Sequence, residues 1–302
     1  MLKEKSIVLE SIVPAGRNKL SDYTELGKLR LLMLVLITTG IGFYLSSWQG
    51  QNFLLLFNVL LGTGCVGAGA NSLNQWYEQD VDARMRRTKN RPIPSGRISS
   101  DEALRFGMVI SLIGLSYLAV TVNWLTTILG FLTWSSYLFI YTPLKQKTVL
   151  NTWIGAVPGA LPPLMGWTAA RGTLELEALT LFAILYFWQL PHFFAISWMY
   201  RDDYRNGNFR MLSLDDPTGK KTSYQIFVNT LLLLIASLSV FFTNQAGIFY
   251  LVSAAGLGCL FLMTTVLFFK EKSVLNAKRV FIASIVYFPV LWFVMILEQI
   301  FA

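Results

Sequence analysis

The sequence predicts an all-α fold: a polytopic membrane protein built as a single bundle of nine transmembrane helices. Two observations lead to this prediction. The 302-residue chain is 54% hydrophobic and only 14% charged, whereas soluble domains average about 25% charged residues. Its apolar residues also gather in long runs, and a helix that crosses a bilayer needs about 20 predominantly apolar residues.

Short polar segments separate nine such runs. We expect membrane spans at 29–47, 53–78, 104–122, 125–141, 153–169, 178–200, 224–242, 246–269 and 280–300. With the N-terminus inside, every Lys and Arg except Arg171 falls in the N-terminal segment, an inner loop or an inner flank. Inner loops of membrane proteins are enriched in Lys and Arg. The N-terminus is therefore predicted in the cytoplasm, and the C-terminus outside the cell membrane.

Residues 1–28 are expected to form a loosely structured or interfacial cytoplasmic segment, and residues 29–302 a single transmembrane domain. The first residues lack the apolar core and cleavage site of a signal peptide. The net charge of +8 follows from topology, with some attraction to anionic lipid, so no nucleic-acid partner is expected. Cys65 and Cys259 lie inside expected spans without a metal-binding spacing, which assigns them to packing.

The stretch 71–97 is the most polar part of the chain near a membrane span. If the second span continues as a helix past Ala70, four oxygen-bearing side chains fall within an arc of about 80° on one face. These are Asn71, Asn74, Glu78 and Asp82. Asp80 lies on the opposite side of the same helix.

This face and the basic residues after it predict a site for a metal and a diphosphate. Carboxylates and side-chain carbonyls suit Mg²⁺, which is completed by waters and substrate phosphates. Guanidinium groups bind phosphate oxygens two at a time. The basic residues nearby are Arg84, Arg86, Arg87, Lys89, Arg91 and Arg97, with Lys145 and Lys147 on the next inner loop and Lys28 and Arg30 before the first span. The alternative is a solvated loop that only sets topology, with Lys28 and Arg30 as headgroup anchors.

The sixth span ends in a second polar group. His192 follows Pro191 and is the single histidine of the chain. In a continuous helix, His192, Ile196, Met199 and Asp203 would share a face, with His192 about 16 Å deeper than Asp203. A polar ring at that depth indicates a functional site, although a histidine satisfied by a neighbouring helix is the alternative.

The fifth span is predicted to be kinked. Between residues 152 and 168 it holds Pro158, Pro162 and Pro163. Carbonyls freed by proline need a partner in protein or in a cavity, because lipid offers none. We therefore expect this helix to line a cavity.

Taken together, these motifs resemble the protoheme IX farnesyltransferases (heme O synthases) of the intramembrane prenyltransferase superfamily. The resemblance extends from about residue 22 through the last span. The motifs that carry it are Asn74-Gln75-x-x-Glu78-x-x-x-Asp82, Met85-x-Arg87-Thr88-x-x-Arg91-Pro92, Tyr141-Thr142-Pro143-Leu144-Lys145, Pro191-His192-Phe193 and Asp202-Asp203-Tyr204.

The resemblance implies a central cavity open to the cytoplasmic side, with farnesyl diphosphate and heme b as substrates and Mg²⁺ as the metal. The farnesyl group would be transferred to a heme vinyl group with addition of water, which gives heme O and diphosphate. The implied metal ligands are Asn71, Asn74, Glu78, Asp82, Asp202 and Asp203; the diphosphate ligands are Arg87, Arg91, Lys145 and Lys28; and His192 would contact heme. Asn74, Glu78, Asp82, Asp203 and Arg87 are the implied catalytic residues.

The sequence departs from the superfamily pattern at two points of the site. Gln75 stands where most members carry an aspartate. Met199 stands where the second acidic motif, Asp-x-x-x-Asp, would place its first carboxylate. We therefore expect one well-held metal and one weaker one.

Two other functions stay open on the sequence alone. The first is the same transfer to an aromatic quinone precursor. The second is a heme or lipid carrier, since broken helices and midplane polar groups are also typical of transporters. Whether a heme A synthase or an oxidase assembly protein is a partner also stays open.

Overall fold

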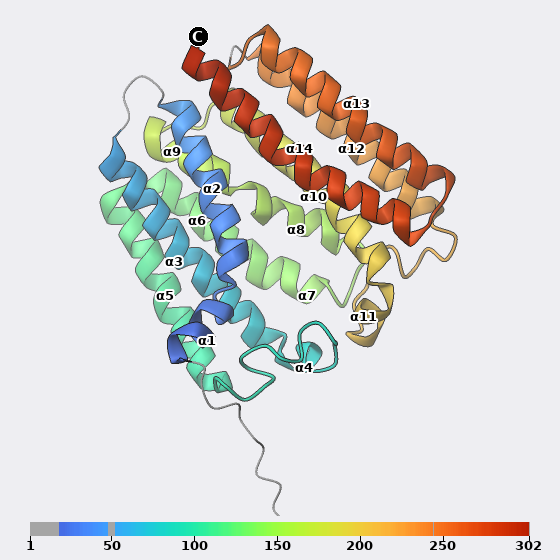
Figure 1. Cartoon of the computed structure of the whole chain (residues 1–302). Helices are drawn as coiled ribbons and strands as arrows, with labels where there is room; N and C mark the ends of the chain where they lie inside the picture. The colour runs from blue at the N-terminus through green and yellow to red at the C-terminus, as the bar shows by residue number, and fades with distance from the viewer. Residues whose placement is uncertain (1–17, 48–51, 244, 302) are drawn as a thin grey trace, which may run out of the picture.

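The computed structural model describes residues 18–47, 52–243 and 245–301, and these residues form an all-helical bundle without strands (Figure 1). Most of the predicted N-terminal segment, residues 1–17, lies outside the described part. The helices are α1 (Lys19–Leu26), α2 (Leu29–Ser46), α3 (Phe53–Tyr77), α4 (Gln79–Asp82), α5 (Ser100–Thr121), α6 (Trp124–Ser135), the π-helical turn η1 (Ser136–Tyr141), α7 (Thr142–Leu144), α8 (Asn151–Ala160), α9 (Pro162–Arg171), α10 (Leu176–Met199), α11 (Arg201–Asn206), α12 (Lys220–Phe242), α13 (Ile248–Lys270) and α14 (Val274–Phe301).

Seven helices in the described residues are long and apolar enough to cross a membrane, namely α2, α3, α5, α10, α12, α13 and α14. The chain is therefore a multi-pass membrane protein. The predicted fourth and fifth spans are not single helices. The fourth consists of α6 continued by η1, and the fifth of α8 and α9, which are separated at Leu161 because Pro162 and Pro163 cannot donate backbone hydrogen bonds.

Side-chain caps explain where several helices begin. Asn52 accepts a hydrogen bond from the Leu55 amide at the start of α3, and Asn123 accepts one from Thr126 at the start of α6. Such caps satisfy backbone N–H groups that the first helical turn leaves unpaired. Helices α3 and α6 therefore each begin directly after an asparagine that caps them.

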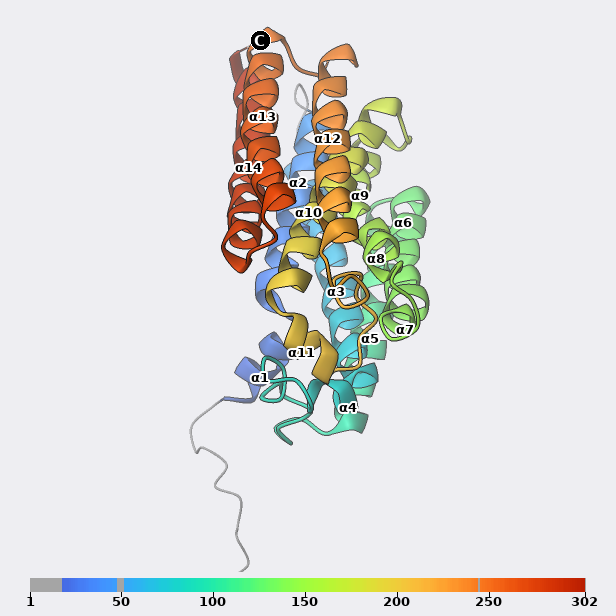
Figure 2. The same cartoon turned by 90° about the vertical axis from the view of Figure 1, so that its right-hand side faces the viewer.

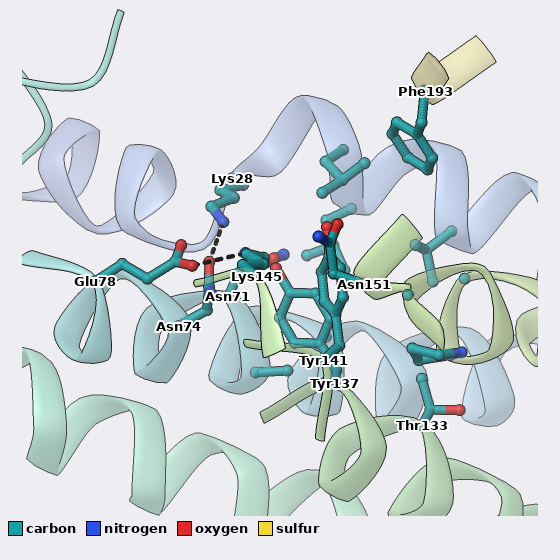
Figure 3. A pocket seen from close by; sticks show the side chains of 18 of the residues that line it. Lys28, Asn71, Asn74, Glu78, Thr133, Tyr137, Tyr141, Lys145, Asn151 and Phe193 are labelled. Atoms are coloured by element: carbon teal, nitrogen blue, oxygen red, sulfur yellow. Dashed lines mark hydrogen bonds and ion pairs between the residues drawn. The ribbon is translucent and has the colours of Figure 1, made fainter. Parts of the chain in front are cut away.

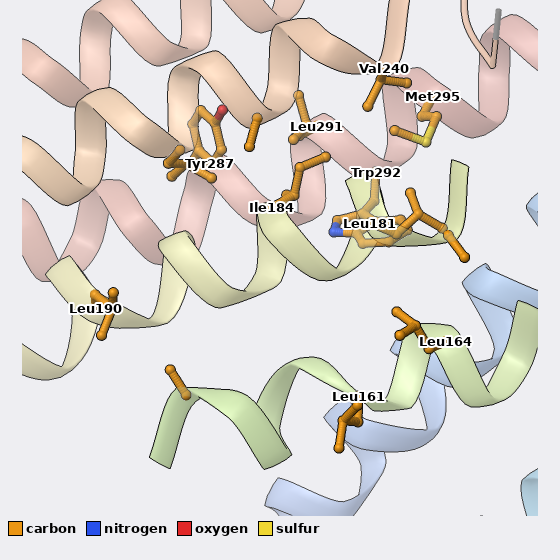
Figure 4. Packing of buried hydrophobic residues seen from close by; sticks show 14 of the residues in the cluster. Leu161, Leu164, Leu181, Ile184, Leu190, Val240, Tyr287, Leu291, Trp292 and Met295 are labelled. Carbon is orange, nitrogen blue, oxygen red and sulfur yellow. The ribbon is translucent and has the colours of Figure 1, made fainter. Parts of the chain in front are cut away.

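The bundle has two halves that pack on each other through α10. In one half α3 lies against α5, and α2 against α9; in the other, α10, α12, α13 and α14 pack together (Figures 1 and 2). The core that joins them contains Leu181 and Ile184 of α10, Leu291 of α14 and Leu164 of α9 (Figure 4). The core therefore fixes α10 between the two halves.

The short helices α1, α4 and α11 gather at one end of the bundle (Figures 1 and 2). There a small apolar cluster of Val81, Met85, Phe209 and Met211 joins the segment after α3 to the segment after α11. The polar segments that follow the second and sixth predicted spans thus meet at the same end, as the sequence implied.

Two glycines allow α2 and α9 to approach closely. A side chain at Gly42 would collide with the carbonyl oxygen of Pro163, and one at Gly166 with that of Thr39. Small residues at such contacts let helix backbones pack in lipid. Since the atoms in the way are backbone atoms, they cannot move aside without shifting a helix.

We predict that Gly42→Ala destabilises the protein by about 1–3 kcal/mol, the usual cost of overpacking. Gly256→Ala is the matched control, because nothing lies within 4 Å of its added methyl group and alanine favours a helix by about 1 kcal/mol over glycine. Thermal unfolding of both variants in detergent measures the difference. Equal midpoints would contradict the close α2–α9 contact.

Candidate active site

One cavity of about 340 Å³ opens inside the bundle at the end where α1, α4 and α11 lie, a size typical of small-molecule sites (Figure 3). Its walls come from α2, α3, α6, η1, α8, α9, α10 and α11 and from the segments after α3 and α11. Eight of the predicted site residues line it: Lys28, Asn71, Asn74, Glu78, Asp82, Arg87, Arg91 and Lys145.

The oxygen-bearing side chains predicted on one face of the second span, called the oxygen ladder below, stay together although the helix is interrupted. Helix α3 ends at Tyr77, and α4 begins at Gln79, with Glu78 between them in the bridge region of backbone space (φ −94°, ψ 7°). Hydrogen bonds with i to i−4 spacing continue across this residue, from the Glu78 amide to the Asn74 carbonyl and from the Asp82 amide to the Glu78 carbonyl. Asn74, Glu78 and Asp82 accordingly all line the cavity. Glu78 is 5% and Asp82 2% exposed, so both carboxylates are buried.

Each of these groups contacts a cation or another polar group. Glu78 Oε1 lies 2.8 Å from Lys145 Nζ, and Asp82 Oδ2 lies 2.6 Å from Arg91 Nη1. Lys28 Nζ donates to Asn74 Oδ1 at 2.6 Å, as Figure 3 shows. Three basic side chains from three different segments therefore contact the oxygen ladder.

Neighbouring charges set the ionisation of the side chains at the charged end of the cavity, called the mouth below. Burial opposes ionisation of Glu78, but the cations of Lys145 and Lys28 hold the pKa of its carboxyl below the usual range. Burial likewise opposes the charge of Lys145, yet Glu78 raises the pKa of that ammonium above its ordinary value. Burial and repulsion by Arg91 and Lys145 lower the pKa of Lys28 to about 7, against the attraction of Glu78 and Asp82.

The mouth carries an excess of positive charge. Of the described residues that line the cavity, Lys28, Arg87, Arg91 and Lys145 are basic, and Glu78 and Asp82 are acidic. Such an excess attracts an anion with several negative charges.

Two tyrosines form the wall beneath Lys145. Its Nζ lies 4.5 Å from the ring centroid of Tyr141 and 5.9 Å from that of Tyr137. Both belong to η1, where Thr142 Oγ1 donates to the carbonyl of Tyr137 five residues earlier. Single π-helical turns are frequent at functional sites. Here the turn brings both rings to the cavity next to the charged mouth.

Beyond the mouth the cavity is mainly apolar. It is lined there by Leu32 and Val35 of α2, Val66 of α3 and Met165 of α9. Leu31 and Phe193, which are 47% and 37% exposed, also line it. An anionic head with a long apolar tail matches this combination of a charged mouth and an apolar interior.

The donors at the mouth fit Mg²⁺. Among the described residues, no three His, Cys, Asp or Glu side chains lie close enough to form a metal site by themselves. Glu78 and Asp82 nevertheless offer two carboxylates, with the amide oxygen of Asn74 beside them. Mg²⁺ is commonly held by one or two carboxylates together with substrate phosphates, so this set suits a metal that arrives with a diphosphate.

The second predicted acidic group is less well placed. Helix α10 ends at Met199, and α11 starts at Arg201 after a turn at Tyr200 (φ −112°, ψ 33°). The predicted continuous face from His192 to Asp203 is therefore wrong. Asp203 is half-exposed on α11 and does not line the cavity, whereas its neighbour Tyr204 does. Asp202 is exposed and pairs with Arg205 at 3.1 Å.

His192 points away from the cavity toward α14. Its Nδ1 lies 2.8 Å from Ser284 Oγ, and its ring packs on Trp188 and Phe281. Ser284 Oγ donates its proton to the carbonyl of Phe281, so it accepts from Nδ1–H of His192. The other ring nitrogen, Nε2, then carries the lone pair.

Several lining residues were not among the sequence-predicted site residues. They are Thr133, Trp134, Tyr137, Tyr141, Asn151, Gln189 and Tyr204. Tyr141 and Tyr204 lie within motifs that the sequence showed, next to Lys145 and Asp203. The others come from four different elements, with Thr133 and Trp134 on α6, Tyr137 on η1, Asn151 on α8 and Gln189 on α10. Which faces of these elements meet at one cavity depends on their packing, and spacing along the chain does not reveal it.

Known proteins with this pattern confirm the resemblance. The UbiA prenyltransferase family matches residues 35–292. The protoheme IX farnesyltransferase of Solibacter usitatus is 40% identical over 287 residues, which cover 92% of this chain and 98% of that protein.

Two solved structures show the same fold. A structure of digeranylgeranylglyceryl phosphate synthase has a TM-score of 0.81 at 21% identity, covering 94% of this chain and 99% of that one. A UbiA homologue from Archaeoglobus fulgidus bound to GPP and Mg²⁺ has a TM-score of 0.64 at 14% identity, covering 91% and 99%. The chain belongs to the UbiA prenyltransferase family, and within it to the protoheme IX farnesyltransferases.

Proposed function

We propose that the protein transfers the farnesyl group of farnesyl diphosphate to a vinyl group of heme b, with addition of water, to give heme O and diphosphate. The observation that carries this proposal is the charged mouth above an apolar cavity, where Glu78 pairs with Lys145 and Asp82 with Arg91. The extensive identity to proteins named for this activity supports heme b as the acceptor.

The mouth is built to stabilise a leaving diphosphate. When the bond between farnesyl C1 and oxygen breaks, negative charge grows on the diphosphate, and the side chains of Arg87, Arg91, Lys145 and Lys28 would stabilise it with positive charge. Mg²⁺ would be held by Asn74, Glu78 and Asp82 and would neutralise further charge on the phosphate oxygens. Lys145 and Arg91 would move from their carboxylates to the diphosphate as the metal takes their place.

The apolar interior would protect the farnesyl cation. Leu32, Val35 and Val66 exclude water from the tail, and the faces of Tyr137 and Tyr141 stabilise nearby positive charge. A heme vinyl carbon then forms the new carbon–carbon bond, and water adds to the neighbouring carbon with loss of a proton. Asp203 and Asp202 stay predicted ligands of a second, weaker metal, and Asn71 of the first.

For the membrane arrangement, we propose nine crossings: the seven long helices together with α6–η1 and α8–α9. Residues 29–302 would form one domain, with the mouth and N-terminus in the cytoplasm and the C-terminus outside the cell membrane. The distribution of Lys and Arg supports this orientation.

Purified protein in detergent, supplied with heme b, labelled farnesyl diphosphate and Mg²⁺, is expected to form labelled heme O and release diphosphate. Mass analysis of the extracted heme measures the product, and 4-hydroxybenzoate serves as the competing acceptor. Farnesyl transfer to hydroxybenzoate but not to heme would show that the acceptor is a quinone precursor. Heme binding without any diphosphate release would indicate a carrier instead.

Glu78→Gln and Asp82→Asn are each expected to lower the rate of farnesyl transfer by about 10²–10³, the usual loss when one stabilising group of such a site is removed. Chelation of Mg²⁺ should have at least as large an effect. Asp80→Asn is the control, because Asp80 is exposed and does not line the cavity. A rate for Glu78→Gln equal to that of Asp80→Asn would refute the metal role.

We further propose that His192 binds heme iron through Nε2, since Nδ1–H is held by Ser284. A heme ligated there would lie on the α10–α14 side, near Phe193, whose ring contacts His192 and which also lines the cavity. His192→Ala is expected to weaken heme binding and to shift the absorption spectrum of bound heme. An unchanged spectrum and affinity would leave His192 a packing residue against α14.

A further inference from the structure

Gln75 belongs to the first motif but not to the cavity. It is 1% exposed, follows Asn74 on α3 and does not line the cavity; its side chain contacts the end of α1, before the connection to α2. Its Nε2 donates to the carbonyl oxygen of Glu25 at 3.1 Å and to that of Leu26 at 2.8 Å. One side-chain amide thus binds the last turn of α1.

The residue that follows this turn has an unusual backbone. Lys28, between α1 and α2, has φ 52° and ψ 54°, a left-handed conformation that residues other than glycine rarely adopt. Such a conformation costs free energy and persists only where the surroundings hold it. Asn71 Nδ2 adds a third contact by donating to the carbonyl oxygen of Gly27 at 3.0 Å.

Helix α1 is also anchored on its outer side. Arg97 pairs with Asp22 and, at 2.9 Å, with Glu25, and Leu26 is fully buried against Ile93 and Ile98. The amides of α3 and these outer contacts grip α1 from two sides. These contacts hold the left-handed backbone of Lys28, whose side chain lines the cavity and reaches Asn74.

We propose that Gln75, assisted by Asn71, is a positioning residue that holds the connection between α1 and α2 so that Lys28 reaches the diphosphate. This inference depends on the diphosphate site of the proposed function. It also accounts for an amide at this position. A carboxylate has no proton to donate and would face two carbonyl oxygens, whereas the glutamine Nε2 donates to both.

The test is a double-mutant cycle on binding of inorganic diphosphate with Mg²⁺, measured by calorimetry on the purified full chain. Lys28→Met is expected to weaken binding about 10-fold, as the loss of a hydrogen bond to a charged group predicts. Gln75→Leu, which keeps the volume but removes the donors, should weaken it to a similar extent. In the Lys28→Met background, Gln75→Leu should add little, because two changes acting through one contact are not additive.

Gln245→Leu is the matched control. Gln245 Nε2 also donates to a backbone carbonyl, that of Glu177. Gln245 follows the C-terminal end of α12 and does not line the cavity. Its substitution should leave diphosphate affinity at the wild-type value.

Two results would overturn the inference. One is wild-type diphosphate affinity in a folded Gln75→Leu variant, and the other is a full additional loss in the Lys28→Met background. If wild-type protein binds diphosphate but forms no heme O, the proposed function fails while the positioning role stands. If it forms heme O and Gln75→Leu binds diphosphate normally, only the positioning role fails.

Discussion

Pairing between buried carboxylates and cations at the cavity mouth is the interaction on which the rest of this structure depends. Removing a charge from water costs several kcal/mol, and removing one partner of a buried pair leaves the other uncompensated. Glu78 meets Lys145 across 67 residues of sequence, and Asp82 meets Arg91. The first contact joins the segment after α3 to the segment after α7, and both hold in place the charged groups that a metal and a diphosphate would bind.

Much of the fold could be predicted because bilayer thickness and hydrophobicity act locally. The second predicted span, 53–78, differs from α3 (Phe53–Tyr77) by one residue, and the first, 29–47, differs from α2 (Leu29–Ser46) by one as well. The shared face of Asn74, Glu78 and Asp82 was also predictable, since helical hydrogen bonding continues across Glu78 where α3 passes into α4. Helical spacing therefore assigned Asn74, Glu78 and Asp82 correctly to one face.

Other features depend on contacts between distant segments. Tyr200 turns the chain between α10 and α11, so spacing alone placed Asp203 and His192 on a common face that does not exist. The π-helical turn at Tyr137 shifts which side chains meet the cavity, and no sequence period announces it. The left-handed Lys28 depends on amides 43 to 47 residues later, which composition and periodicity do not reveal.

A structure of the protein with Mg²⁺ and an unreactive thio analogue of farnesyl diphosphate tests the central claim most directly. We expect a metal bound by Glu78 and Asp82 and the farnesyl tail inside the apolar cavity. Lys145 and Arg91 should have left these carboxylates to bind phosphate oxygens. If both ion pairs stay closed and the diphosphate binds elsewhere, the account is contradicted.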